Sequence, residues 1–352
     1  MQRKDSAVMP LAHSDRLTPS NLLGSFANRA RHGSPAYVLV NQLRLDTAAE
    51  REAIALGLLD DPARLPPKLF YDALGSTLYE AIVRTDEYYL TRAEQTIVAQ
   101  HRLEIAATIG TGRQWVDLGS GDSTKAEAWF ELARPSRYIA VDISATALCA
   151  ALARLAGRAD APPLIGLVTD FSERLDVANL MTAEPALFHY PGSSIGNFMP
   201  EEALRLLTQI RAHCSGRGGG LLIGVDSQKE VARLKAAYDD ALGVTAAFNR
   251  NILRHVNRLL GTRFDPADWR HVAHYDRGLA RIEMHLEAQQ AIEMAIGERR
   301  RCFARAERIH TENSYKYTRE GFRRLLAEAG FSRVCCWTDE EESFYVFFAA
   351  AD

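Results

Sequence analysis

The chain has 352 residues and a formal net charge of -3, from 42 Lys and Arg against 45 Asp and Glu. Hydrophobic residues make up 47% of it and charged residues 25%, which is a globular composition and excludes a disordered or fibrous chain. The length favours two domains over one. Apolar runs such as Tyr345–Ala351 are far shorter than the roughly 20 residues of a membrane span. The near-neutral charge gives no electrostatic footprint for nucleic acid.

Cysteine and histidine usage argues against metal and disulfide chemistry. The five cysteines are odd in number and form no Cys-x-x-Cys pair, so neither a disulfide framework nor a zinc signature is present. The ten histidines form no His-x-His or His-x-x-x-His pair, and we expect no metal site. Free thiols fit a reducing compartment, which predicts a cytoplasmic protein. We also expect a monomer with neither nucleic-acid nor membrane partners.

The first 35 residues differ in pattern from the rest of the chain. They are polar and lack periodicity, and no apolar stretch typical of a secretory signal follows Met-Gln-Arg-Lys. We therefore expect residues 1–35 to form a flexible N-terminal arm. Beyond the arm, amphipathic spacing predicts a short helix over Ser76–Val83 and a longer one over 93–109.

Short apolar runs then alternate with helical patterns. The predicted strands are Gln114–Gly119, Tyr138–Ile143, Leu164–Val168, Ala186–Tyr190 and Leu221–Val225. Helical spacing between them includes Thr146–Leu155 and Glu201–Ala212. Buried strands that alternate with helices predict an α/β fold with a parallel sheet. Near the end, a helix over Arg319–Gly330 precedes an antiparallel pair formed by Phe331–Trp337 and Phe344–Ala350.

Residues 228–318 interrupt this scheme. About ninety residues are too many for a loop, and the alternating run Ala280–Leu286 indicates a strand within them. We expect an inserted α+β lobe that binds substrate and is built from 36–92 plus 228–318. A cofactor-binding domain would then comprise 93–227 plus 319–352. The basic stretch Glu298–Arg305 is interpreted as a solvated helix face.

The strongest local signal is a glycine-rich turn within Val116–Thr124, where a strand ends and a helix begins. Gly119 and Gly121 let a ligand approach the backbone closely, and we expect both of them and Ser120 to bind the cofactor. A dinucleotide fingerprint requires glycine at the third position of Gly-x-Gly-x-x-Gly, and here that position is Thr124. An NAD-dependent oxidoreductase is therefore disfavoured.

Acidic residues follow the next two predicted strands. Asp142 ends the second strand, where a carboxylate can bind a ribose diol. Asp170 and Phe171 follow the third, and a carboxylate beside an aromatic ring suits adenine. Ligands of open α/β sheets bind at these carboxyl ends. S-adenosylmethionine (SAM) fits better than NAD, because nothing is arranged for a pyrophosphate. With the terminal strand pair, the pattern resembles the seven-stranded Rossmann-like fold of class I methyltransferases.

Six longer stretches of the chain are distinctive: 66–72, 87–94, 192–198, 237–251, 281–284 and 311–316. Together they resemble the ergothioneine-biosynthetic histidine Nα-methyltransferase family, whose members convert histidine to hercynine. The resemblance runs from about residue 64 to the C-terminus.

The resemblance implies a role for individual residues. It implies substrate contacts by Tyr88, Asn197, Tyr238, Thr245, Met284, Glu312 and Ser314, and a Tyr71 near the reacting amine. Among these, Asn197 and Tyr238 match positions that hold the α-carboxylate. Glu312 and Ser314 match the pair that grips the imidazole ring, and Met284 matches a wall residue that helps to select histidine. On the cofactor side, Gly119, Lys125, Asp142, Asp170 and Phe171 all match.

The residue types suit this chemistry on their own terms. Amine methylation needs orientation more than covalent help, and Asn and Tyr are suitable donors to a carboxylate. Two alternatives remain open. The same reaction on tryptophan or tyrosine would leave Glu312 poorly satisfied in the ring pocket. A non-catalytic module that binds SAM would keep the fold without the activity.

Overall fold

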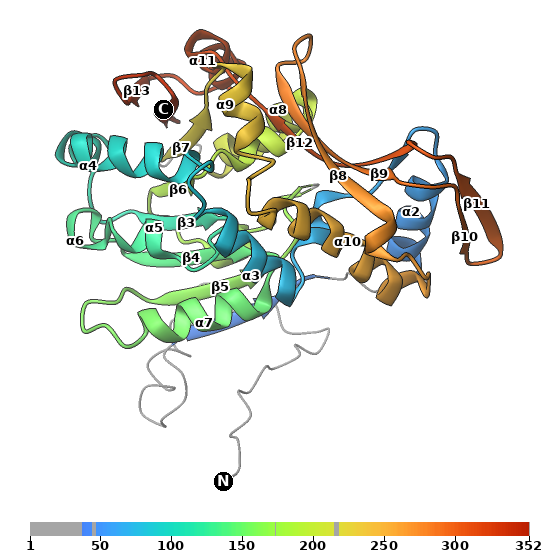
Figure 1. Ribbon diagram of the computed structural model, residues 1–352. Helices are drawn as coiled ribbons and strands as arrows, with labels where there is room; N and C mark the ends of the chain where they lie inside the picture. Colours follow the sequence, from blue (N-terminus) through green and yellow to red (C-terminus); the bar gives the residue numbers. More distant parts are fainter. Residues whose placement is uncertain (1–36, 44–46, 173, 215–217, 352) are drawn as a thin grey trace.

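The structure is a computed structural model, and it describes residues 37–43, 47–172, 174–214 and 218–351 (Figure 1). The expected N-terminal arm, residues 1–35, lies outside the described residues. Two sheets dominate the rest: a central sheet of eight strands and a second sheet of four. A separate two-stranded hairpin adjoins the second sheet (Figure 1).

The central sheet confirms the expected parallel α/β fold. Its strands are β1 (Tyr37–Asn41), β3 (Gln114–Leu118), β4 (Arg137–Asp142), β5 (Leu164–Val168), β6 (Ala186–Tyr190), β7 (Gly220–Asp226), β13 (Val334–Thr338) and β14 (Phe344–Ala350). They lie in the order β1-β5-β4-β3-β6-β7-β14-β13. Strand β14 alone runs against its neighbours β7 and β13. Continuous apolar runs form these strands because both faces of the sheet are covered.

The number of strands is one more than the seven expected. Strand β1 pairs in parallel with β5 at the edge of the sheet. Its residues come from the segment 36–92 that the sequence assigns to the substrate lobe. Val38 and Val40 are buried, while Tyr37 and Leu39 are half-buried. This short run therefore joins the sheet through a tertiary contact that its local pattern does not specify.

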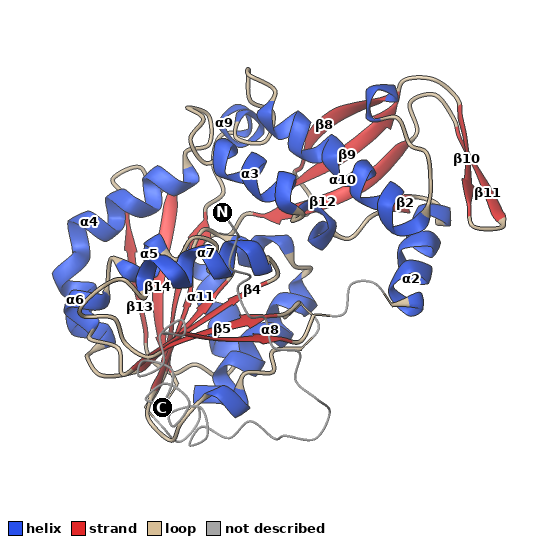
Figure 2. Ribbon diagram, turned by 90° about the horizontal axis from the view of Figure 1, so that it is seen from below, coloured by secondary structure: helices blue, strands red, loops and turns tan. Residues whose placement is uncertain are grey.

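Helices cover both faces of the central sheet (Figure 2). The helices around it are α4 (Leu90–Ile109), α5 (Thr124–Glu127), α6 (Phe130–Ala133), α7 (Ala145–Leu155), α8 (Pro200–Cys214) and α11 (Arg319–Glu328), with the short η2 (Ala178–Leu180) and η3 (Ser194–Asn197) in loops. One buried apolar cluster joins α4 and α7 to one face, and a second joins α8 and α11 to the other. The helices cover the faces of the sheet. The carboxyl ends of its parallel strands therefore stay open together along one side, which is called the carboxyl edge below.

The second sheet belongs to the segments expected to form the substrate lobe. Its strands β2 (Ala63–Arg64), β8 (Trp269–Asp276), β9 (Arg281–Ala288) and β12 (Arg308–Tyr315) lie in the order β2-β12-β9-β8. The accompanying helices are α2 (Ala48–Leu59), α3 (Ala73–Ile82), α9 (Val231–Ala236), α10 (Val244–Leu260), η1 (Pro67–Phe70) and η4 (Pro266–Asp268). Every second residue of β9 is buried, and this face packs on α10. The division of the chain into two lobes stays a prediction.

The basic stretch Glu298–Arg305 is not helical, which corrects the interpretation of a solvated helix face. It contains strand β11 (Arg299–Phe303), which pairs with β10 (Ile292–Ile296) across a tight turn. Gly297 adopts a positive φ of 60° in this turn, a conformation that glycine adopts readily and that favours a two-residue hairpin. The arginines are therefore exposed alternately along a strand.

Candidate functional site

The glycine-rich turn folds back onto the neighbouring strand. Gly119 and Gly121 have φ values of 63° and 51°, which explains glycine at both positions. The amide N–H groups of Gly119 and Ser120 donate to the carbonyl of Val141, at 2.8 and 3.1 Å. A Cβ added to Gly121 would meet no heavy atom within 4 Å. The turn thus leaves open space above the ends of β3 and β4.

Asp142 is the last residue of β4 and lies beside this turn. Its Oδ2 accepts a hydrogen bond of 2.8 Å from the Gly121 amide, and its Oδ1 accepts one of 2.8 Å from Ser144. Burial raises the pKa of Asp142, although those backbone donors favour its charged form. Each carboxylate oxygen keeps a lone pair beyond these bonds, so Asp142 is able to accept hydrogen bonds from a ribose diol.

Asp170 and Phe171 follow β5, the next strand along the edge. Asp142 lies beside Val168 in the parallel register, so all three residues line the same edge. Oδ2 of Asp170 lies 3.2 Å from Nζ of Lys68, a residue of η1. The Phe171 ring meets the Tyr190 ring edge-on at 5.9 Å between centroids. Two carboxylates that can accept hydrogen bonds and an aromatic ring thus follow neighbouring strands, an arrangement that fits the ribose and adenine of SAM.

The Lys125 side chain, which we expect to bind the cofactor, forms an ion pair with another residue of the protein. Its Nζ lies 2.6 Å from Oε2 of Glu94 in α4. Although burial opposes its charge, Glu94 raises the pKa of Lys125 above the ordinary value. Oε1 of Glu94 accepts a hydrogen bond of 2.9 Å from the Gly192 amide. The pair therefore ties the glycine turn to the loop that precedes η3. Contact between Lys125 and the cofactor stays a prediction.

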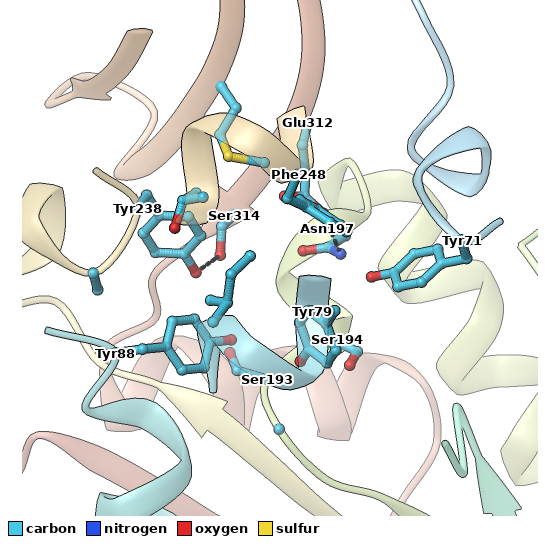
Figure 3. Close-up of a pocket in the computed structure, with 15 residues that line it drawn as sticks. Tyr71, Tyr79, Tyr88, Ser193, Ser194, Asn197, Tyr238, Phe248, Glu312 and Ser314 are labelled. Carbon is cyan, nitrogen blue, oxygen red and sulfur yellow. Dashed lines mark hydrogen bonds between the residues drawn. The ribbon is translucent and has the colours of Figure 1, made fainter. Parts of the chain in front are cut away.

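A pocket lies between the two sheets, and it contains every residue that the sequence assigns to the substrate (Figure 3). The predicted residues that line it are Tyr71, Tyr88, Asn197, Tyr238, Thr245, Met284, Glu312 and Ser314. They come from the six separate stretches that carry the resemblance, and the structure brings all of them together. Their individual roles stay predictions.

Strand geometry explains the placement of the residues that we expect to grip the ring. Glu312 and Met284 are cross-strand partners on β12 and β9, and paired residues project from the same face of a sheet. Ser314 lies two residues further along β12 and shares that face. The expected selector Met284 is buried, and it lines the pocket next to Glu312 on the neighbouring strand.

Asn197 approaches from the central sheet, at the end of η3. Gly196 permits this approach, since a Cβ there would lie 2.8 Å from the carbonyl oxygen of Tyr315. Nδ2 of Asn197 then donates a hydrogen bond of 3.0 Å to Oε1 of Glu312. Burial raises the pKa of Glu312 to about 8, an effect that the charge of Lys316 partly opposes. At neutral pH, the Glu312 carboxyl is therefore protonated to a larger extent than the carboxyl of an exposed glutamate.

Hydroxyl groups line the opposite side of the pocket. The Tyr238 and Ser314 oxygens lie 2.7 Å apart and share a hydrogen bond (Figure 3). The amide of Thr245 donates to Asp240 at 2.7 Å, which fixes the first turn of α10. Tyr88 is 7% exposed and meets the Tyr238 ring edge-on. These groups present hydrogen-bonding capacity to a small polar ligand.

Tyr71 lines the pocket with its hydroxyl directed toward the Asn197 amide (Figure 3). The charge of Asp142, at the end of β4, also acts on this hydroxyl. The Tyr71 ring packs edge-on against Tyr79 and Phe248, both at 6.1 Å between centroids. Burial, together with the nearby Glu312, raises the pKa of Tyr71 well above its ordinary value. The hydroxyl therefore stays protonated, and it can orient an amine but not act as a phenolate base.

Sequence reasoning missed Tyr79 and Phe248, which line the pocket, and Asp226 and Lys316 behind it. Tyr79 lies within the predicted helix Ser76–Val83, to which the sequence analysis gave no role in the site. Phe248 and Lys316 lie inside stretches that carry the family resemblance. Asp226 is the last residue of β7. Its position at the carboxyl end of a parallel strand could have indicated that it lies near the site.

The described residues offer no metal site and no membrane-spanning helix. No group of three His, Cys, Asp or Glu side chains in this part of the chain could hold a metal ion. No helix of the described ranges is long and apolar enough to cross a bilayer. Each of the five cysteines is a free thiol.

The strand order, the glycine turn and the acidic strand ends together define a class I SAM-dependent methyltransferase. The particular family follows from comparison with known proteins. Residues 50–351 match a family described as histidine-specific methyltransferase, SAM-dependent, and the chain belongs to this family.

Similar proteins carry consistent names. The chain is 38% identical to the histidine N-alpha-methyltransferase of Mycolicibacterium smegmatis, over 87% of this chain and 97% of that protein. It is 31% identical to ergothioneine biosynthesis protein 1 of Neurospora crassa, over 94% of this chain and 39% of that protein. A solved SAM-dependent methyltransferase from Clostridium acetobutylicum has a TM-score of 0.42 at 12% identity, covering 78% of this chain and 96% of that one.

Proposed function

We propose that the enzyme transfers three methyl groups from SAM to the α-amine of L-histidine, giving hercynine for ergothioneine biosynthesis. The observation that carries the proposal is the hydrogen bond between Asn197 and Glu312, which holds a buried carboxyl group in the pocket, where we expect the substrate ring. Membership of a histidine-specific family supports the same substrate. Relatives named for histidine methylation and for ergothioneine biosynthesis support the product.

In the proposed complex, Glu312 and the imidazole ring share one proton. A Glu312 carboxyl with a pKa near 8 is largely protonated at neutral pH, whereas a free imidazole is largely neutral. Transfer of that proton to the ring gives an imidazolium and a carboxylate, joined by a charge-assisted hydrogen bond. A phenyl or indole ring cannot take the proton, so the buried carboxyl would lose its partner. This difference selects histidine over the other aromatic amino acids.

The other end of the substrate is held by donors. An Asn amide carries two N–H groups, and Asn197 uses one of them for Glu312. The second is free for the substrate carboxylate, and Tyr238 donates to the same group. With both ends gripped, the α-amine is directed to the cofactor side of the pocket, near Tyr71. Orientation of this kind contributes roughly 7–11 kcal/mol to a bimolecular reaction.

When bound, SAM supplies a sulfonium methyl group to the lone pair of the amine nitrogen. Asp142 would hold its ribose, and Asp170 with Phe171 would hold its adenine. The amine loses one proton with each of the first two methyl transfers, and the third leaves a quaternary centre. Tyr71 orients the amine or a water molecule that accepts these protons. The pocket is lined by several aromatic rings (Figure 3), which suit the growing positive charge.

The experiment is a reaction of SAM with an equimolar mixture of the twenty amino acids, analysed by mass spectrometry. A gain of three methyl groups on histidine alone is the expected result. Methylated tryptophan or tyrosine would overturn the roles of Glu312 and Met284 and keep the fold and cofactor. Binding of SAM without any product would favour a non-catalytic module.

We also propose a cytoplasmic monomer that has no nucleic-acid or membrane partner. The thiol content and the net charge of -3 support this proposal. Size-exclusion chromatography with light scattering should give a mass near the chain mass of 39.1 kDa. A dimer mass would contradict the monomer.

A further inference from the structure

A buried lysine lies directly behind the pocket and has no part in the proposed grip on the substrate. The Lys316 side chain is fully buried, and its Nζ lies 2.7 Å from Oδ2 of Asp226, which is also fully buried. The same ammonium group donates to the Tyr238 hydroxyl and to Oγ of Ser314, each at 2.9 Å. Asp226 raises the pKa of Lys316 to about 12 against the effect of burial, so the lysine stays charged. A buried charge therefore contacts both hydroxyls of the pocket.

Asp226 is the anchor of this arrangement. Its carboxylate also accepts hydrogen bonds from the Tyr89 hydroxyl, at 2.8 and 2.9 Å, and contacts Nζ of Lys229 at 2.5 Å. Its amide donates to Oγ of Ser193 at 2.8 Å. The Asp226 cluster, meaning Asp226 with Tyr89, Lys229 and Lys316, thus joins β7 to α4, to the loop before η3 and to the end of β12.

The hydrogens in this cluster can be counted. An ammonium group carries three N–H donors and no acceptor, and Lys316 has three partners: Asp226, Tyr238 and Ser314. The Tyr238 and Ser314 hydroxyls bring two hydrogens, and their mutual bond uses one of them. One hydroxyl hydrogen remains, on Ser314 or on Tyr238 depending on the direction of that bond. In either direction, the pair offers a donor to the pocket.

Without the lysine this constraint disappears. Each hydroxyl oxygen would regain a lone pair, and the remaining hydroxyl hydrogen could turn toward the space of the lysine instead of toward the ligand. The positive charge next to the hydroxyls would also be lost. A substrate group that accepts hydrogen bonds, such as an α-carboxylate, depends on both features.

We propose that Lys316, anchored by Asp226, is a positioning residue that makes the Tyr238–Ser314 hydroxyl pair direct its one remaining hydrogen toward an acceptor group of the amino-acid substrate. The inference rests on the proposed function, because it takes the ligand to be an α-amino acid. Lys316 does not touch the substrate, and it acts only through the two hydroxyls.

Charge balance alone does not account for Lys316. Lys229 already contacts the Asp226 carboxylate and also donates to the Tyr89 hydroxyl at 2.7 Å. The two lysines thus share the same anchor, but Lys316 contacts the pocket hydroxyls and Lys229 makes no such contact among the described residues. This difference supplies a matched pair of variants, Lys316→Met and Lys229→Met.

The test compares the two variants in steady-state kinetics and in SAM binding. Lys316→Met should raise KM for histidine about 10- to 100-fold, as expected for the loss of hydrogen bonds that involve charged groups. Its Kd for SAM should stay that of the wild type, which also reports that the fold is intact. Lys229→Met should leave KM for histidine unchanged. An equal rise in KM for both variants would overturn the proposal.

A second comparison keeps the proposal testable where Lys316→Met lowers stability. Both lysine changes are made in a background that carries Tyr238→Phe and Ser314→Ala. Because the hydroxyls are then absent, Lys316→Met should raise KM by less than threefold in this background. A rise as large as in the wild-type background would overturn the proposal.

The proposed function is judged separately, by whether the wild-type chain methylates histidine. If another amino acid is methylated instead, the lysine comparison is made with that substrate, and the same outcomes decide it.

Discussion

Nδ2 of Asn197 donates a hydrogen bond of 3.0 Å to Oε1 of Glu312, across 115 positions of sequence. Asn197 belongs to a loop of the central sheet, and Glu312 lies on a strand of the second sheet. The bond therefore couples the residue assigned to the substrate carboxylate with the residue assigned to the ring. Each end of the pocket depends on the other for its geometry.

This coupling predicts that changes at the two positions are not additive. Asn197→Ala removes a donor to the substrate and leaves one oxygen of Glu312 without its partner, so kcat/KM for histidine should fall about 10- to 100-fold. Combining it with Glu312→Gln should cost less than the product of the two single effects, because the shared bond is lost only once. Initial rates for the four proteins of the cycle measure this.

Asn313 provides the control for this cycle. It is the next residue along β12, and its side chain accepts a hydrogen bond of 2.9 Å from His310 on the other face of the strand. Asn313→Ala should change kcat/KM by less than threefold. Full additivity of the two pocket changes would refute the coupling.

The raised pKa of Glu312 predicts a pH-dependent stability. The folded pKa is about 8 against an ordinary value of 4.5, so between these values the native state retains a proton that the unfolded chain has lost. This group therefore makes the free energy of unfolding fall as pH rises from about 4.5 to about 8, with no further change above that. Glu312→Gln lacks the titration. The free energy of unfolding of Glu312→Gln, measured by urea unfolding, should therefore rise relative to that of the wild type between pH 4.5 and about pH 8. A constant difference between the two proteins over this pH range would contradict the prediction.

The extent to which the sequence predicted the fold depended on local pattern. Leu164–Val168, Ala186–Tyr190 and Phe344–Ala350 form strands with the predicted bounds, because continuous apolar runs are typical of strands that are buried on both faces. β1 was missed, because its position depends on pairing with a strand more than a hundred residues away. The basic hairpin was wrongly interpreted as a helix face. That interpretation rested on the run of charged residues, whereas Gly297 indicates a tight turn between two strands.

The candidate site shows the same contrast. The pocket residues could be named because the motifs that carry the resemblance contain them. The Asp226 cluster could not, since a buried ion pair between β7 and β12 leaves no periodicity or spacing in the chain. Buried lysine is rare unless it is paired, but sequence alone does not distinguish a buried lysine from an exposed one.

The cofactor edge makes a prediction about two aspartates near the same turn. Asp142→Asn keeps the shape of the side chain but replaces one acceptor oxygen by a donor group, in a place where Gly121 and Ser144 already donate. Two donors would then face each other, and Kd for SAM should rise about 10- to 100-fold. Isothermal titration calorimetry with SAM measures the change.

Asp122 is the matched control, because it lies in the turn itself and caps Thr124 from an exposed position. Asp122→Asn keeps an acceptor oxygen for that cap, and Kd for SAM should stay within threefold of the wild type. Equal losses in both variants would mean that Asp142 acts on the turn and not on the cofactor.

Tyr71 gives the most direct test of how protons leave the amine. Because its hydroxyl is held protonated by burial, Tyr71→Phe should lower kcat about tenfold or more, through lost orientation, while KM for SAM stays unchanged. Mass spectrometry of the mono-, di- and trimethylated products under single-turnover conditions resolves the three steps. The first two, which release a proton from the amine in the same way, should slow together.

Tyr317→Phe removes a buried hydroxyl that has no hydrogen-bond partner among the described residues, and it should leave all three rates unchanged. An unchanged rate for every methyl transfer in Tyr71→Phe would show that the hydroxyl has no part in the reaction.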